Sequence, residues 1–178
     1  MSVDIDAKRA CLALHRVLAK AASPASCVAL ANAGHFPVLL DSHNTTTRLV
    51  CARILADVPC SGDGTARKNV QLWSSWTRKE ALKLFVVQRK ILLRALYLMP
   101  PGGLLVYSTC SMNPLENEAV VLSALRRWRD RQRNFAALEL LDAASACESA
   151  GCKLPIAAGM THWLVPAPVR SGALFASW

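Results

Sequence analysis

The sequence predicts an α/β fold with parallel strands, and three observations lead to that class. Short apolar runs alternate with longer segments of helical periodicity, the pattern of parallel strands joined by helices. Thr77 and Glu80 form a T-x-x-E capping box at the start of one long amphipathic segment. The proline-glycine stretch 100–103 ends that segment immediately before another apolar run.

The order of the elements follows from periodicity and from the breakers between them. The first half is predicted to contain a strand at 2–5, a helix at about 7–22, a strand at 27–31, a loop at 32–47 and a strand at 49–58. The second half is predicted to contain a helix from Thr77, a strand at 104–107, a helix capped by Asn113, and strands near 136–141 and 162–165. The apolar stripes of the two later helices are expected to be Leu82, Phe85, Leu92 and Leu96, and then Leu115, Ala119, Leu122 and Leu125.

Composition indicates a globular, soluble, intracellular protein. The 178 residues are 53% hydrophobic and 19% charged, enough for one core, so we expect a single domain over 1–178. No apolar stretch approaches the ~20 residues that span a bilayer, and the first ten residues do not read as a secretory signal. Nucleus and cytoplasm stay open as locations, as does the oligomeric state.

Charge favours an anionic partner without identifying it. The formal net charge is +9, from 21 basic and 12 acidic residues. Such a surplus promotes association with nucleic acid, but on charge alone a merely basic soluble protein is an equally good interpretation. Three basic clusters stand out, each more often a solvated helix face than a binding site: Arg67-Lys68, Arg78-Lys79-Lys83 and 126–133.

The seven cysteines do not form a metal or disulfide pattern. Their number is odd and no pair has C-x-x-C spacing, so neither a zinc site nor a disulfide framework is expected. Most of them are predicted to be small core residues.

Two cysteines are placed differently, because each follows the end of a predicted strand. Cys60 follows one strand, which carries Asp57 near its end, and Cys110 follows another. Parallel strands bring their carboxyl ends to one sheet edge, where sites gather. Asp4, after the first short strand, is expected at the same edge.

Cys110 also precedes the helix that Asn113 is predicted to cap. Free amides and the helix dipole at such a position favour an anion, and therefore a thiolate. Taken alone, a half-buried and inert cysteine is the more common occurrence at a strand end.

The segments around these residues resemble the Sun-family RNA (cytosine-5) methyltransferases, in particular the eukaryotic branch that modifies tRNA. The two longest are DVPCSGDGTARKN at 57–69 and YSTCSMNPLENEAVV at 107–121. Shorter similar segments are VDIDAKR at 3–9, VVQRKILLRAL at 86–96 and GMTHW at 159–163. The resemblance implies a Rossmann-like class I methyltransferase fold with a doubly wound, mostly parallel sheet.

The resemblance also implies a mechanism, residue by residue. Cys110 corresponds to the cysteine that attacks carbon 6 of the target cytosine, which activates carbon 5 towards the methyl group of S-adenosylmethionine. Cys60 corresponds to the cysteine that assists breakdown of the adduct. Asp57 corresponds to an acid between cofactor and base, and Asp4 to the acid that holds the cofactor's ribose. RNA, with tRNA foremost, is the implied partner; no membrane and no metal are implied.

The chain departs from the family pattern in two places. The glycine-rich cofactor loop that precedes the ribose acid has no counterpart, so we expect a C-terminal portion of the catalytic domain that lacks the first strand-helix unit. The family's adenine-proximal aspartate has no counterpart near 32–35. A non-catalytic RNA-binding remnant is therefore an alternative. A thiol hydrolase using Cys110 is a weaker one, because none of the four histidines follows a catalytic strand end.

Overall fold

The computed structural model describes residues 2–20, 28–40, 48, 50–131, 138–141 and 175–176. It divides into two compact units, residues 1–50 and 51–178. Both combine helices with small parallel sheets, as the α/β prediction requires. No helix in the described ranges is long and apolar enough to cross a membrane.

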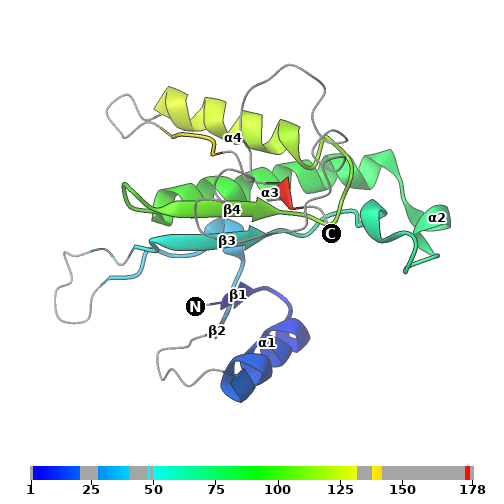
Figure 1. Ribbon diagram of the computed structural model, residues 1–178, viewed down its shortest axis with the longest axis horizontal. Coiled ribbons are helices and arrows are strands. Elements are labelled where there is room, and N and C mark those ends of the chain that lie inside the picture. The colour runs from blue at the N-terminus through cyan, green and yellow to red at the C-terminus, as the bar shows by residue number, and fades with distance from the viewer. Residues whose placement is uncertain are drawn as a thin grey trace. The chain divides into compact units, whose positions relative to one another are not determined.

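The first unit is a strand-helix-strand arrangement. Strand β1 (Ser2–Asp4) leads into helix α1 (Ala7–Lys20), and strand β2 (Val28–Leu30) pairs in parallel with β1 (Figure 1). A short 3-10 turn, η1 (Ala33–His35), follows, capped by the Asn32 side chain, which accepts from Gly34 N. The predicted strands and helix are confirmed here, and each strand ends one residue earlier than predicted.

The second unit is built on a three-stranded sheet in the order β3-β4-β5. Strand β3 (Arg53–Asp57) and strand β4 (Leu104–Ser108) are parallel, with Asp57 opposite Ser108. Strand β5 (Phe175–Ala176) adds two parallel pairs to β4. The register places the last residues of β3 and β4 side by side, so the loops that follow both strands start from one edge.

Two helices cover one face of this sheet (Figure 1). Helix α3 (Arg78–Leu98) and helix α4 (Glu118–Arg131) share one buried cluster with β3 and β4. The cluster consists of Ala56, Val58, Leu92, Tyr107, Val120, Val121 and Ala124. Side chains alternate between faces along β3, so Ala56 is buried while Leu55 is 68% exposed.

The ends of α3 follow the predicted rules. The Thr77 hydroxyl accepts from Glu80 N at 3.3 Å, while the Glu80 carboxylate pairs with Lys83 instead of returning to the cap. After the helix, Gly102 has φ +76°, and Gly103 N donates to Pro100 O at 2.9 Å.

Several predicted details are wrong. The predicted strand 49–58 is shortened to β3, and no strand forms in the described residues 138–141. Leu82 and Leu122, expected to be buried, are 47% and 46% exposed, whereas the neighbouring Ala81 and Ala124 are fully buried. Helix α4 starts at Glu118 rather than directly after Asn113.

The structure adds helix α2 (Leu72–Ser75) and the 3-10 turn η2 (Asp63–Thr65), which the sequence did not suggest. The strand expected at 162–165 lies outside the described residues.

Candidate active site

Two loops meet at the carboxyl ends of β3 and β4. Val58 N donates to Ser108 O at 3.2 Å, and Gly64 N donates to Cys110 O at 3.1 Å. The second contact requires glycine, because a Cβ at position 64 would lie 2.7 Å from Cys110 O. Gly62, at φ +72°, allows the chain to turn before η2. These backbone contacts hold the Cys60 loop against the Cys110 loop.

The two loops bring the predicted cysteines into contact. Cys60 Sγ and Cys110 Sγ are 3.2 Å apart, a thiol-thiol hydrogen-bond distance well beyond the ~2.05 Å of a disulfide. Burial, and next the hydrogen bond with Cys110, raise the pKa of Cys60 from 9.0 to about 12. Cys60 is therefore a neutral thiol near pH 7, able to donate its proton to Cys110 Sγ.

The expected helix dipole behind Cys110 is absent. Residues 114–117 form turns, and α4 begins eight positions after Cys110. Asn113 does not cap the α-helix; its side chain accepts from Leu115 N at 3.1 Å within the turn. The dipole of a helix acts within its first turn, so the neighbouring Cys60 thiol replaces it as the donor that can stabilise a Cys110 thiolate.

A buried carboxylate lies beneath both cysteine loops. Glu116 is 0% exposed, and its oxygens accept from Ser61 N at 2.8 Å, Ser61 Oγ at 2.5 Å and Ser111 Oγ at 3.1 Å. Gln88 Nε2 donates to the same carboxylate at 3.0 Å and to Pro59 O at 2.9 Å. Asn113 Nδ2 completes the set at 3.4 Å.

Two aspartates line the loops in different ways. Asp57 is exposed at the end of β3, and its Oδ1 accepts from Ser108 Oγ at 2.9 Å. Asp63 joins the loops, because its Oδ1 accepts from Met112 N at 3.0 Å. Asp57 thus keeps an exposed carboxylate beside the thiol loops, as predicted.

Asp4 lies at the carboxyl end of β1, in the other unit. Its two oxygens accept from Arg9 Nη2 at 2.8 Å and Nε at 3.0 Å, and Asp6 N also donates to Oδ1. The Arg9 hydrogen bond, followed by the Asp6 amide, lowers the pKa of Asp4. A permanent carboxylate at a parallel strand end suits two ribose hydroxyls, and Arg9 is exposed enough to move aside. Its position relative to the thiols stays a prediction.

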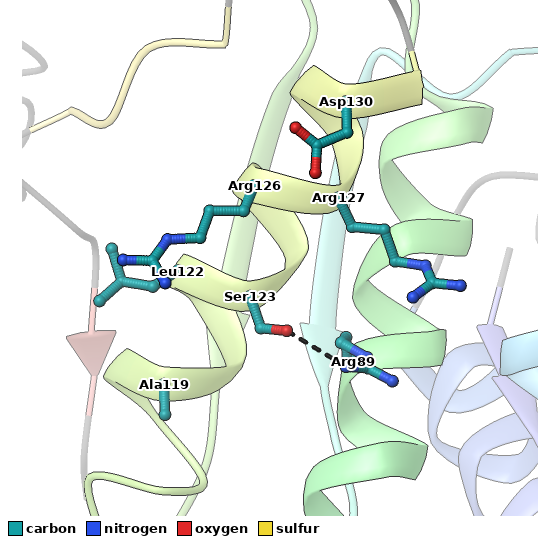
Figure 2. Close-up of a pocket in the computed structure, with 7 residues that line it drawn as sticks. All are labelled: Arg89, Ala119, Leu122, Ser123, Arg126, Arg127 and Asp130. Carbon is teal, nitrogen blue, oxygen red and sulfur yellow. Dashed lines mark hydrogen bonds between the residues drawn. The ribbon is translucent and has the colours of Figure 1, made fainter.

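A basic groove lies between α3 and α4 on the helical layer. It has a volume of about 400 Å³ and is lined by Arg89, Ala119, Leu122, Ser123, Arg126, Arg127 and Asp130. Figure 2 shows Arg89 of α3 reaching to Ser123 of α4, whose hydroxyl accepts from Nη1 at 3.2 Å. The Arg89 guanidinium also lies 5.4 Å from the centre of the Phe85 ring. Three guanidinium groups against one carboxylate make the groove an anion-attracting surface.

Sequence reasoning found the cysteines but missed the groups that hold them. In the sequence, Glu116 stands three residues after Asn113, where it suggests a helix start, and Gln88 lies within the segment 86–96 that resembles the family. One signal was available, since a glutamine within an otherwise apolar helical stripe implies a buried polar partner.

Known proteins with similar sequence or structure point in one direction. A multisite-specific tRNA:(cytosine-C(5))-methyltransferase of Saccharomyces cerevisiae is 47% identical over 133 residues, 73% of this chain and 19% of the relative. A tRNA (cytosine(34)-C(5))-methyltransferase of Drosophila melanogaster is 36% identical over 162 residues, 90% of this chain and 20% of the relative. The chain therefore spans about a fifth of the length of these relatives.

A solved structure and a family model agree with these relatives. The crystal structure of PH0851 superposes with a TM-score of 0.60 at 26% identity, covering 79% of this chain and 29% of that one. The sequence model described as 16S rRNA methyltransferase RsmB/F matches residues 34–176, which include both cysteine loops. The resemblance stated from the motifs is confirmed, and the chain belongs to the RsmB/F family of RNA methyltransferases.

Proposed function

We propose that the chain carries the cysteine pair of an S-adenosylmethionine-dependent RNA (cytosine-5) methyltransferase that acts on tRNA. The observation that carries the proposal is the 3.2 Å contact between the Cys60 and Cys110 sulfur atoms at the ends of two parallel strands. Family membership and the tRNA substrates in the relatives' names support it.

Cys110 is the nucleophile in this proposal. Its thiolate forms a bond to carbon 6 of cytosine, and the electrons of the C5–C6 double bond make carbon 5 nucleophilic. Bound S-adenosylmethionine supplies the methyl group that carbon 5 takes up. Loss of the C5 proton then re-forms the double bond, breaks the C6–S bond and returns the Cys110 thiolate. The base must leave its stack to reach this edge.

The role of Cys60 in this proposal depends on whether Cys110 is a free thiolate or is bonded to the base. While Cys110 is a free thiolate, the Cys60 thiol donates to it across the 3.2 Å contact. Once Cys110 is bonded to carbon 6 it carries no charge, so its hydrogen bond and its charge no longer raise the pKa of Cys60, while burial still does. Cys60 then releases its proton to solvent more readily, and the resulting thiolate accepts the C5 proton during release.

The cofactor is assigned to Asp4 and Asp57. The Asp4 carboxylate provides acceptors for ribose hydroxyls, and the exposed Asp57 carboxylate lies at the start of the Cys60 loop. This assignment fits the doubly wound, Rossmann-like fold that the resemblance implies.

RNA outside the target base is assigned to the basic groove between α3 and α4. Arg126 and Arg127 are exposed there, and neither takes part in the ion pairs among described residues. Phosphates of the RNA backbone are suited to such guanidinium groups, which bind them through paired N–H donors.

Methyl transfer to a tRNA transcript tests the proposal. The protein is incubated with radiolabelled S-adenosylmethionine and tRNA, and the nucleosides are separated by mass spectrometry. We expect label in 5-methylcytosine with the parent protein and none with Cys110→Ser. RNA binding without any methylation would contradict the proposal and support a non-catalytic RNA-binding role.

A further inference from the structure

Glu116 lies in a turn, yet its carboxylate accepts more hydrogen bonds than the turn itself needs. Five donors converge on it, three of them from the residues that directly follow Cys60 and Cys110: the amide and hydroxyl of Ser61 and the hydroxyl of Ser111. The other two are Gln88 Nε2 and Asn113 Nδ2. Every group facing the carboxylate is an N–H or O–H donor.

Among the described residues, no cationic side chain pairs with this buried carboxyl group. Neither ion pair in the part of the chain that the structure describes includes Glu116. A buried carboxylate is unfavourable unless charge-assisted hydrogen bonds satisfy it, and apolar packing would hold two loops together at lower cost. The placement of Glu116 therefore indicates that directional hydrogen bonds are needed at this position.

The donors define what the carboxylate fixes. Oε1 accepts from both serine hydroxyls, so one oxygen ties the residue after Cys60 to the residue after Cys110. Oε2 accepts from Ser61 N and from Gln88, which also holds Pro59 O on the other side of Cys60. The Cys60 loop is thus held on both sides of its thiol.

We propose that Glu116 is a positioning residue that sets the separation of the Cys60 and Cys110 thiols by binding the residue after each one. Gln88 assists it by holding the residue before Cys60. The role rests on the proposed function for its purpose, since a proton passes between thiols only at hydrogen-bond distance. Glu116 itself touches neither the base nor the cofactor in this account.

Diamide oxidation measures thiol separation without methyl transfer. The reagent takes up the two thiol hydrogens as Cys60 and Cys110 join in a disulfide, and mass spectrometry quantifies the linked peptides. Glu116→Gln replaces one acceptor oxygen by an NH2 group, so either Ser61 N and Gln88 Nε2 face a donor or both serine hydroxyls must turn to accept. We expect it to slow the linkage by about tenfold, because a misplacement of about 1 Å has large effects on proximity-dependent reactions.

The matched control is Glu118→Gln, which changes a carboxyl to an amide two positions further on. Among the described residues, the Glu118 side chain makes no hydrogen bond or ion pair with either cysteine loop. We expect its linkage rate to stay within about twofold of the parent, well below the positioning effect. Thermal melting verifies that each variant is folded. If Glu116→Gln does not fold, Ser61→Ala replaces it, since it removes one hydroxyl donor and is expected to slow the linkage in the same direction.

An unchanged linkage rate in folded Glu116→Gln would overturn the positioning role. Where Ser61→Ala replaces that variant, an unchanged rate in Ser61→Ala would overturn it in the same way. Equal slowing by Glu118→Gln would overturn it too, because charge rather than geometry would then be responsible. A protein that transfers no methyl group but shows the expected linkage pattern would contradict the proposed function alone.

Discussion

Cys60 and Cys110 lie fifty residues apart in the chain, yet their sulfur atoms are 3.2 Å apart. The parallel register of β3 and β4 produces this contact. It pairs Asp57 with Ser108, so the loops that follow the two strands begin side by side at one edge of the sheet. Gly64 then lets the first loop donate to the carbonyl of Cys110. The pair is a product of sheet topology and not of local sequence.

The raised pKa of Cys60 predicts an unusual pH profile for its alkylation. A thiol with the ordinary value reacts progressively faster with iodoacetamide up to about pH 9 and then levels off. With its pKa at about 12, Cys60 is expected to react slowly at pH 8 and to accelerate about tenfold per pH unit through pH 10. Peptide mass spectrometry follows the reaction, and a plateau near pH 9 would contradict the assignment.

The raised pKa of Cys60 also determines how the stability of the fold depends on pH. Between pH 9.0 and about 12 the folded chain keeps a proton on Cys60 that the unfolded chain has lost. The free energy of unfolding contributed by this group is therefore fully present below pH 9.0 and falls as the pH rises across that window. Urea unfolding of the parent and of Cys60→Ala at several alkaline pH values measures it, with a flatter profile expected for the variant.

Gly64 is predicted to be indispensable for the contact between the loops. Gly64→Ala places a methyl group 2.7 Å from Cys110 O, so a backbone must shift. We expect a loss of about 1–3 kcal/mol in the free energy of unfolding, as for other overpacked sites, and slower diamide linkage of the thiols. Gly102→Ala is the control. A Cβ at position 102 would have no atom within 4 Å, although the backbone φ there is +76°.

Gly102→Ala is expected to lower stability by about 1–2 kcal/mol through backbone strain while leaving the linkage rate unchanged. Urea unfolding and diamide oxidation separate the two effects. If both glycine variants slowed the linkage alike, the close approach at Gly64 would not be the cause.

The basic groove is predicted to contribute to RNA affinity through phosphates. Replacing Arg126 and Arg127 by glutamine should weaken binding of tRNA several-fold and reduce the slope of log K against log salt by about 0.7–0.9 per lost contact. Arg53→Gln, an exposed arginine at the start of β3, is the control. Fluorescence anisotropy between 50 and 200 mM salt (about fourfold in concentration) gives the slope, and an unchanged slope would exclude the groove.

The sequence was informative where a local signal and the topology agree. Breakers such as Pro59 and the 100–103 stretch located the ends of strand and helix, and the strand ends located both cysteines. The placement of both thiols at one sheet edge followed from one rule, that parallel strands share a carboxyl edge, whereas their direct contact is a finding of the structure. The two-residue strand β5 had no such signal, because its pairing with β4 is long-range and too short for periodicity.

Glu116 shows why the rest could not be predicted. A glutamate three residues after an asparagine suggests a helix start, and local rules favour that interpretation. In the fold, donors from Ser61 and Gln88 offer the carboxylate stronger bonds than the local amide, and α4 begins only at Glu118. A partner fifty-five residues away overrides the local preference, and no single-sequence pattern contains it.

The proposed function gives the two cysteines different roles, and trapping of RNA tests that difference most directly. If Cys110 forms the bond to carbon 6, as proposed, Cys110→Ala should abolish both methylation and any covalent RNA complex. If Cys60 assists release, as proposed, Cys60→Ala should leave the complex able to form but slow to resolve. Denaturing gels of each variant with substrate RNA should show an RNA-linked band for Cys60→Ala only. An RNA-linked band with Cys110→Ala and none with Cys60→Ala would show that the two roles are reversed.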